Sequence, residues 1–86
     1  MKLNIRGKNL SVTPAIKEYI ERKSERLEKY FGEEFDVAAT IKTEGNEQVA
    51  ELYVTSETDS YRAVTENKDL YASIDEDMDI LERQIR

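Results

Sequence analysis

The chain has 86 residues, which suffices for one small domain and leaves no room for a second. It has neither cysteine nor histidine, which excludes disulfides, thiolate nucleophiles, histidine bases and the usual zinc ligands. Its 13 basic and 19 acidic residues give a formal net charge of −6, which on its face argues against a nucleic-acid partner.

The first third of the chain predicts a strand and then a helix. Residues 1–6 alternate apolar and polar side chains, which is typical of a half-buried strand. Thr13 and Pro14 indicate a helix start, with threonine as the N-cap and proline at the first helical position. Apolar residues then recur at helical spacing up to Gly32, a natural C-cap. We therefore expect a helix over residues 14–31.

Three more strands and a second helix are expected in the rest of the chain. Apolar and polar residues alternate over 35–42, 49–55 and 61–65, with turn sequences between them. Such short connections favour an antiparallel meander. After Asn67 and Asp69, either of which could be the N-cap, apolar residues step by three or four, which predicts an amphipathic helix.

The element order β-α-β-β-β-α predicts an α+β fold. The first helix connects the first two strands, so these strands are expected to be parallel, with a right-handed crossover. Each element is expected to run opposite to the one before it, so the two helices should be parallel to each other. We expect both to pack on one face of a four-stranded sheet. Their C-terminal halves should then lie at the same end of the molecule.

Charge is unevenly distributed along the chain. Residues 1–31 hold eight bases and four acids (+4), whereas residues 32–86 hold five bases and fifteen acids (−10). An acidic protein of this kind can present a basic face. The basic residues that should converge at the helix ends are Lys23, Arg26 and Lys29 in the first helix and Arg83 and Arg86 in the second. Arg22 shares a helix face with Arg26 and Lys29.

Two separated stretches carry a family pattern. They comprise Met1–Asn9, Val12–Ile16, Lys23 and Leu27–Phe31, and then Asp69–Asp75 and Leu81–Arg86. These stretches resemble the family of ribosome hibernation-promoting factors and ribosome-associated inhibitors, and the resemblance covers nearly the whole chain. It implies a fold similar to double-stranded RNA-binding domains. It also implies a translation inhibitor that binds the small ribosomal subunit at the mRNA and tRNA sites under stress or in stationary phase.

The resemblance also implies which side chains contact ribosomal RNA. The family's basic positions fall on Lys23 and Arg26, with Lys29 as a less regular neighbour. On the second helix Arg83 matches, and Arg86 begins what is usually a longer basic tail. Together with Arg22, these residues form the expected phosphate-binding site, which would recognise the shape and charge of RNA rather than its bases.

Two departures from the family pattern predict weaker RNA binding. Family members often carry an apolar pair and a lysine where this chain has Glu76, Asp77 and Ile80. The basic run usually found after the second helix is missing.

Blander interpretations of the same residues remain open. Basic helix residues often form a solvated face with ion pairs one turn apart, here Lys17–Glu21, Glu18–Arg22 and Glu25–Lys29. The main alternative function is an acidic protein-interaction module without RNA binding, which could use an exposed strand edge.

Three tyrosines also have two possible roles. Tyr30, Tyr53 and Tyr61 could stack on bases, but Asp36 and Glu51 make the free sheet face acidic, which favours packing for the tyrosines.

No catalytic or metal-binding motif is present in the sequence. The three glycines form no phosphate loop, and Asp75, Asp79 and Glu82 share a helix face without a loop that could cage a cation, so we expect a solvated acidic face. We expect that the protein is not an enzyme and that it binds no cofactor, metal or small-molecule substrate. No apolar run is long enough for a membrane span and no signal peptide pattern is present. The expectation is a single ribosome-binding domain, residues 1–86, in the cytoplasm, with no membrane partner.

Overall fold

A computed structural model describes all residues from Met1 to Arg86 and confirms the predicted α+β fold. The elements are β1 (Lys2–Lys8), α1 (Pro14–Ser24), a 3-10 turn (Glu25–Leu27), α2 (Glu28–Phe31), β2 (Phe35–Glu44), β3 (Glu47–Ser56), β4 (Ser60–Asn67) and α3 (Leu70–Ile85). Their order is the predicted one, with the first helix tightened at the 3-10 turn.

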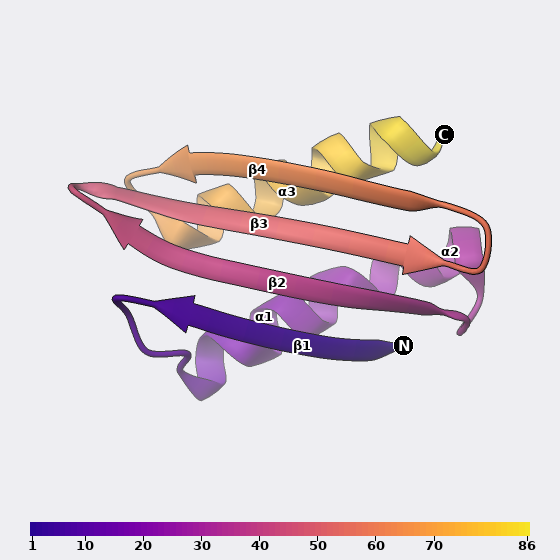
Figure 1. Cartoon of the computed structure of the whole chain (residues 1–86), viewed down its shortest axis with the longest axis horizontal. Coiled ribbons are helices and arrows are strands. Elements are labelled where there is room, and N and C mark those ends of the chain that lie inside the picture. The colour runs from indigo at the N-terminus through magenta and orange to yellow at the C-terminus, as the bar shows by residue number, and fades with distance from the viewer.

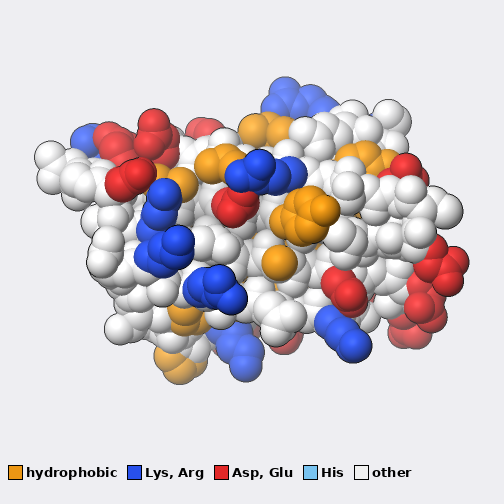
Figure 2. Space-filling model, in the orientation of Figure 1, with side chains coloured by type: hydrophobic (Ala, Val, Ile, Leu, Met, Phe, Trp, Pro, Cys, Tyr) orange, Lys and Arg blue, Asp and Glu red, His pale blue; other side chains and the backbone are white.

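The sheet has its four strands in chain order, β1-β2-β3-β4. β1 pairs in parallel with β2, and the other two pairs are antiparallel, as expected. Figure 1 shows that the helices lie on one side of the sheet and that α1 and α3 run in the same direction. The other side of the sheet carries no helix, and Figure 2 looks directly onto it.

Local hydrogen bonds explain where the helices begin. The Thr13 hydroxyl accepts a hydrogen bond from the Ile16 amide at 3.2 Å, which caps α1. At α3 the cap is Asp69, whose carboxylate accepts from the Tyr71 amide at 3.0 Å. Asn67, the other candidate, lies in β4 and donates from its side chain to Ser73 instead.

The hairpin between β2 and β3 extends both strands beyond the predicted limits. Glu44 and Glu47 face each other in register, so only two residues form the turn. Gly45 takes the first turn position with φ of +60°, a conformation that glycine adopts without steric cost.

The core lies between the inner face of the sheet and the helices. Alternate residues of β2 and β3 pack against the apolar stripes of α1 and α3, and 14 buried residues form one cluster. Its largest fully buried members are Ile20, Leu27, Ile41, Leu52, Ile74, Met78 and Leu81. None of the helices is long and apolar enough to cross a membrane.

One carboxyl group is buried on the core side of α3 without a partner. Asp77 is fully buried, and neither of its carboxylate oxygens has a hydrogen-bond partner. Burial raises the pKa of Asp77 to about 8, so the side chain is largely protonated at neutral pH. The expectation that Asp77 weakens an RNA-binding surface is therefore wrong, because this residue is not on the surface.

Candidate functional site

The ends of the two long helical segments meet, as the parallel-helix argument predicted. Arg26 from the 3-10 turn and Arg83 and Arg86 from the end of the chain line one hollow of about 310 Å³. Asp79 and Glu82 of α3 complete its lining. We call the six predicted basic residues the helix face, and this hollow is where its two halves join.

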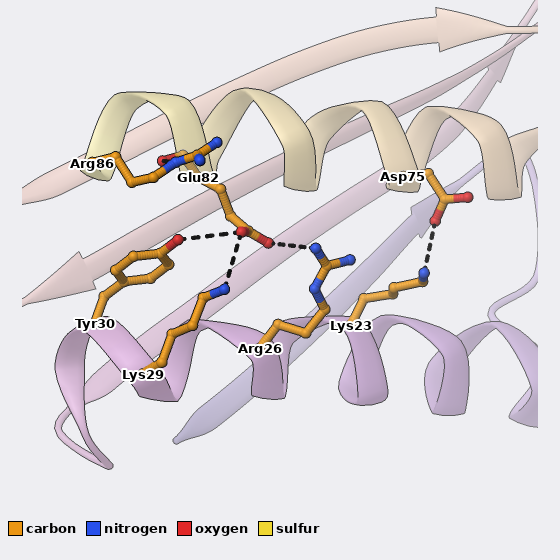
Figure 3. Close-up of polar contacts among 7 residues, drawn as sticks. All are labelled: Lys23, Arg26, Lys29, Tyr30, Asp75, Glu82 and Arg86. Carbon is orange, nitrogen blue, oxygen red and sulfur yellow. Dashed lines mark hydrogen bonds and ion pairs between the residues drawn. The ribbon is translucent and has the colours of Figure 1, made fainter.

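Glu82 is the central partner of the helix face. The residue is only 6% exposed and lies between the helices (Figure 3). Its carboxylate is 2.8 Å from the Arg26 guanidinium and 3.6 Å from the Lys29 ammonium. The Tyr30 hydroxyl donates a hydrogen bond to the same carboxylate at 3.2 Å. Glu82 thereby fixes two of the predicted phosphate-binding bases in place.

Asp75 has the same role closer to the start of α3. Its carboxylate lies 3.5 Å from the Lys23 ammonium and accepts a hydrogen bond from the Tyr19 hydroxyl at 2.6 Å. This hydrogen bond, with burial, raises the pKa of Tyr19 to about 12, so the phenol remains a donor. The Lys23 ammonium also lies 5.3 Å from the centre of the Tyr19 ring, close enough for a cation–π contact.

The remaining three bases of the helix face have no carboxylate partner. Arg22, Arg83 and Arg86 are exposed and form no ion pair, although Arg86 donates to the main-chain oxygen of Glu82 at 3.3 Å. Arg22 does not line the hollow. The carboxylates of Asp75 and Glu82 therefore offset part of the positive charge of the six bases.

The local ion pairs considered for the first helix are absent. None of the pairs spaced one turn apart is within ion-pair distance, and the bases pair across to α3 instead. The expectation of a solvated acidic face is also wrong for Glu82. Parallel packing of the helices buries this side chain against the bases, where water screens its charge less than at the surface.

Of the three candidate stacking tyrosines, two are packed and one is not. Tyr30 bonds to Glu82, and the Tyr61 ring lies 6.1 Å from that of Phe31. Tyr53, in contrast, is 41% exposed on the uncovered side of the sheet, so the expectation of packing is wrong for this residue. The sequence predicted a free sheet face, but the acids on it led to the wrong expectation that Tyr53 packs elsewhere.

The uncovered side of the sheet is not uniformly acidic. Asp36 and Glu51 lie on it as expected, but Glu51 is paired with Arg62. Figure 2 shows blue side chains gathered toward β1. Those on β1 are Lys2, Arg6 and Lys8, which sequence reasoning counted but did not assign to a surface. No group of three or more acidic side chains is arranged to hold a metal ion.

Ribosome hibernation factors of several bacteria are similar in sequence to this chain over its whole length or nearly so. The chain is 37% identical to the ribosome hibernation promotion factor of Bacillus subtilis, over its full length but only 47% of the relative. The corresponding factor of Lactococcus lactis gives 40% identity and 48% coverage, so the chain spans about half the length of these relatives. Against the ribosome hibernation promoting factor of Klebsiella oxytoca, identity is 34%, covering 99% of the chain and 90% of that protein.

Solved structures show the same fold. The crystal structure of the Thermus thermophilus Protein Y N-terminal domain superposes with a TM-score of 0.93 at 35% identity, covering 99% of this chain and 96% of that one. A ribosomal subunit interface protein from Coxiella burnetii has a TM-score of 0.86 at 20% identity, a likeness of fold alone. The resemblance noted in the sequence is thus confirmed. Because the family model matches residues 3–86, the chain belongs to the Sigma 54 modulation protein / S30EA ribosomal protein family.

Proposed function

We propose that this protein is a ribosome hibernation factor. Residues 1–86 act as one domain that binds the small ribosomal subunit at the mRNA and tRNA sites and inhibits translation under stress or in stationary phase. The observation that carries the proposal is the convergence of Arg26, Arg83 and Arg86 on one hollow where α1–α2 and α3 meet. The names of the relatives that the chain resembles support it.

The proposed mechanism is steric and electrostatic. Arginine side chains of the helix face bind phosphates of ribosomal RNA through two parallel hydrogen bonds, and lysines act as point charges. Glu82 and Asp75 hold Arg26 and Lys23 in position before RNA arrives, which lowers the entropy lost on binding. The bound domain then blocks the path of mRNA and tRNA. No step requires a catalytic residue, and the site of action is cytoplasmic.

The alternative, an acidic interaction module without RNA binding, is less well supported. It would be favoured by basic residues scattered around the molecule next to a long free strand edge. Here the bases of the two helical segments adjoin in one hollow, which suits a phosphate backbone.

Salt dependence of binding tests the proposal. The chain is sedimented with purified small ribosomal subunits at about 50 mM and about 200 mM salt. Phosphate contacts by the three bases without a carboxylate partner predict a loss of affinity of about 40-fold over this range, whereas contacts by all six bases would give about 2,000-fold. Binding that does not change with salt, or no binding at all, would contradict the mechanism.

A further inference from the structure

The edge strand β1 presents a row of bases without partners. Lys2, Arg6 and Lys8 alternate with the residues of β1 that face the core, so all three lie on the uncovered side of the sheet. None of them forms an ion pair, in contrast to Lys23, Arg26 and Lys29 on the helices. We call these three residues the sheet row. Its positive charge is not offset by any contact within the chain.

One end of the sheet row meets a further base. Lys8 lies directly opposite Lys42 of β2 in the parallel register, and like charges in that position repel one another. Lys42 is paired with Glu44 at 3.4 Å, which offsets part of this repulsion. Both lysines line a shallow hollow of about 400 Å³ on the uncovered side, together with Arg62 and three acids, Glu44, Glu51 and Glu66. Lys8 is the one base of this hollow without a carboxylate partner, so an anion placed beside Lys8 would relieve the remaining repulsion.

Tyr53 stands on the same side of the sheet, with its ring open to solvent. In register it is flanked by Ala38 of β2, which is too small to cover the ring, and by Arg62 of β4. Every other aromatic ring of the chain is paired with another ring, whereas Tyr53 contacts none. Figure 2 shows an apolar side chain near the middle of this face with both basic and acidic side chains around it.

We propose that the uncovered side of the sheet binds a single strand of RNA, with one base stacked on Tyr53 and the adjoining phosphates on Arg6, Lys8 and Lys42. Exposed aromatic rings on a sheet bind unpaired bases by stacking, and nearby cations hold the backbone. Tyr53 and Arg6 are two strands apart, about 10 Å across the sheet, a span that one or two nucleotides and an arginine side chain can bridge.

The acids of this side limit the path of the strand. Asp36 lies opposite Lys2 in register, which makes that end of the sheet row unfavourable for phosphate. Glu51 is already paired with Arg62, so the β4 side offers little free positive charge. The strand is therefore confined to the end of β1 that holds Arg6 and Lys8. This surface is on the opposite side of the molecule from the helices, so it goes beyond the proposed ribosome contact (Figure 1).

A fluorescence titration tests the stacking contact. Because the chain has no tryptophan, Tyr53→Trp introduces a single reporter at the proposed site. A ten-nucleotide uridine-rich RNA should quench its emission saturably at low salt. Adding Arg6→Gln and Lys8→Gln should weaken the apparent affinity about tenfold, because two phosphate contacts are lost. The matched control, Lys17→Gln with Lys68→Gln, removes one exposed lysine of α1 and one between β4 and α3. This control should change the apparent affinity less than about twofold.

Absence of quenching, or quenching that the Arg6 and Lys8 substitutions leave unchanged, would overturn the proposal. A second measurement uses the unaltered protein: amide chemical shifts are recorded with the same RNA. Shifts in β1, β2 and β3 are expected. Shifts confined to α1 and α3 would overturn the sheet site while leaving the proposed ribosome contact standing. Conversely, if RNA quenches the fluorescence as expected but the protein does not bind small ribosomal subunits, only the proposed function would be contradicted.

Discussion

Bases on the two sides of this molecule are held in different ways. On the helix face, Lys23, Arg26 and Lys29 each lie beside a carboxylate that α3 supplies. In the sheet row the bases have no such partner. A paired base is well positioned but partly neutralised, whereas an unpaired base keeps its full charge. A simple count of basic residues therefore overstates the attraction of the helix face for phosphate groups and understates the attraction of β1.

The largest effect is expected from reversing charge in the hollow. Arg26→Glu together with Arg83→Glu should weaken binding to small ribosomal subunits about 100-fold or more, because two phosphate contacts become repulsive. Co-sedimentation at about 100 mM salt measures the change. The matched control, Lys17→Glu with Lys68→Glu, alters the net charge equally. Equal losses in the two variants would show that only net charge matters and that the helix face is not the site.

Buried carboxyl groups of α3 extend the comparison to the protein interior. Glu82 is buried beside two bases, whereas Asp77 is buried without a partner. Burial raises the pKa of Asp77 to about 8 in the folded chain, whereas the pKa of this carboxyl group in the unfolded chain is about 4. Between these pH values the folded chain holds an extra proton. Its stability is therefore greatest at low pH in this range and falls as pH rises.

Asp77→Asn should remove this dependence. The free energy of unfolding of the variant should exceed that of the parent by an amount that grows from about pH 4 to about pH 8, reaching the order of a few kcal/mol. Urea unfolding at several pH values measures it. Asp79→Asn, an exposed acid of the same helix, should show no such trend. Parallel stability profiles for Asp77→Asn and the parent would mean that Asp77 is not buried as a neutral acid.

Releasing a base from its acid should increase RNA affinity modestly. Asp75→Asn keeps an acceptor for the Tyr19 hydroxyl but removes the negative charge beside Lys23. We expect affinity for small subunits to rise about threefold, since one repulsive charge next to the phosphates is gone. Glu57→Gln, an exposed acid in the turn before β4, serves as the control. A fall in affinity would show that positioning of Lys23 outweighs the neutralisation of its charge.

The smallest effect is expected for Lys29→Gln. Lys29 shares Glu82 with Arg26 and lies farther from the carboxylate, and its side chain is 60% exposed. Its loss should weaken small-subunit binding only about twofold. A loss as large as that of Arg26→Gln would mean that the shared carboxylate does not neutralise the lysine.

Much of the fold followed from local patterns in the sequence. Alternating strands, the Thr13-Pro14 start and the Gly32 stop gave the element order, and the crossover rule gave the parallel helices and their common end. These features depend on neighbours in the chain. The limits of the strands were less accurate, because hairpin pairing extends them beyond the alternating residues.

The partners of the charged residues did not follow from local patterns. The rule of one-turn spacing suggested pairs within the first helix, but the carboxylates that bind Arg26 and Lys23 come from α3, more than fifty positions away. The burial of Asp77 and the exposure of Tyr53 likewise depend on which side of an element is covered in three dimensions. Such tertiary contacts decide whether a base is neutralised or free.

The most direct test of the central claim is RNA cleavage from a probe tethered to the helix face. Because the chain has no cysteine, Asp79→Cys provides a single attachment point at the edge of the hollow that Arg26 and Arg83 line. An iron chelate attached there, on protein bound to small ribosomal subunits, should cleave ribosomal RNA at the mRNA and tRNA sites. A probe that leaves this RNA uncut, although the labelled protein still co-sediments with the subunit, would contradict the account.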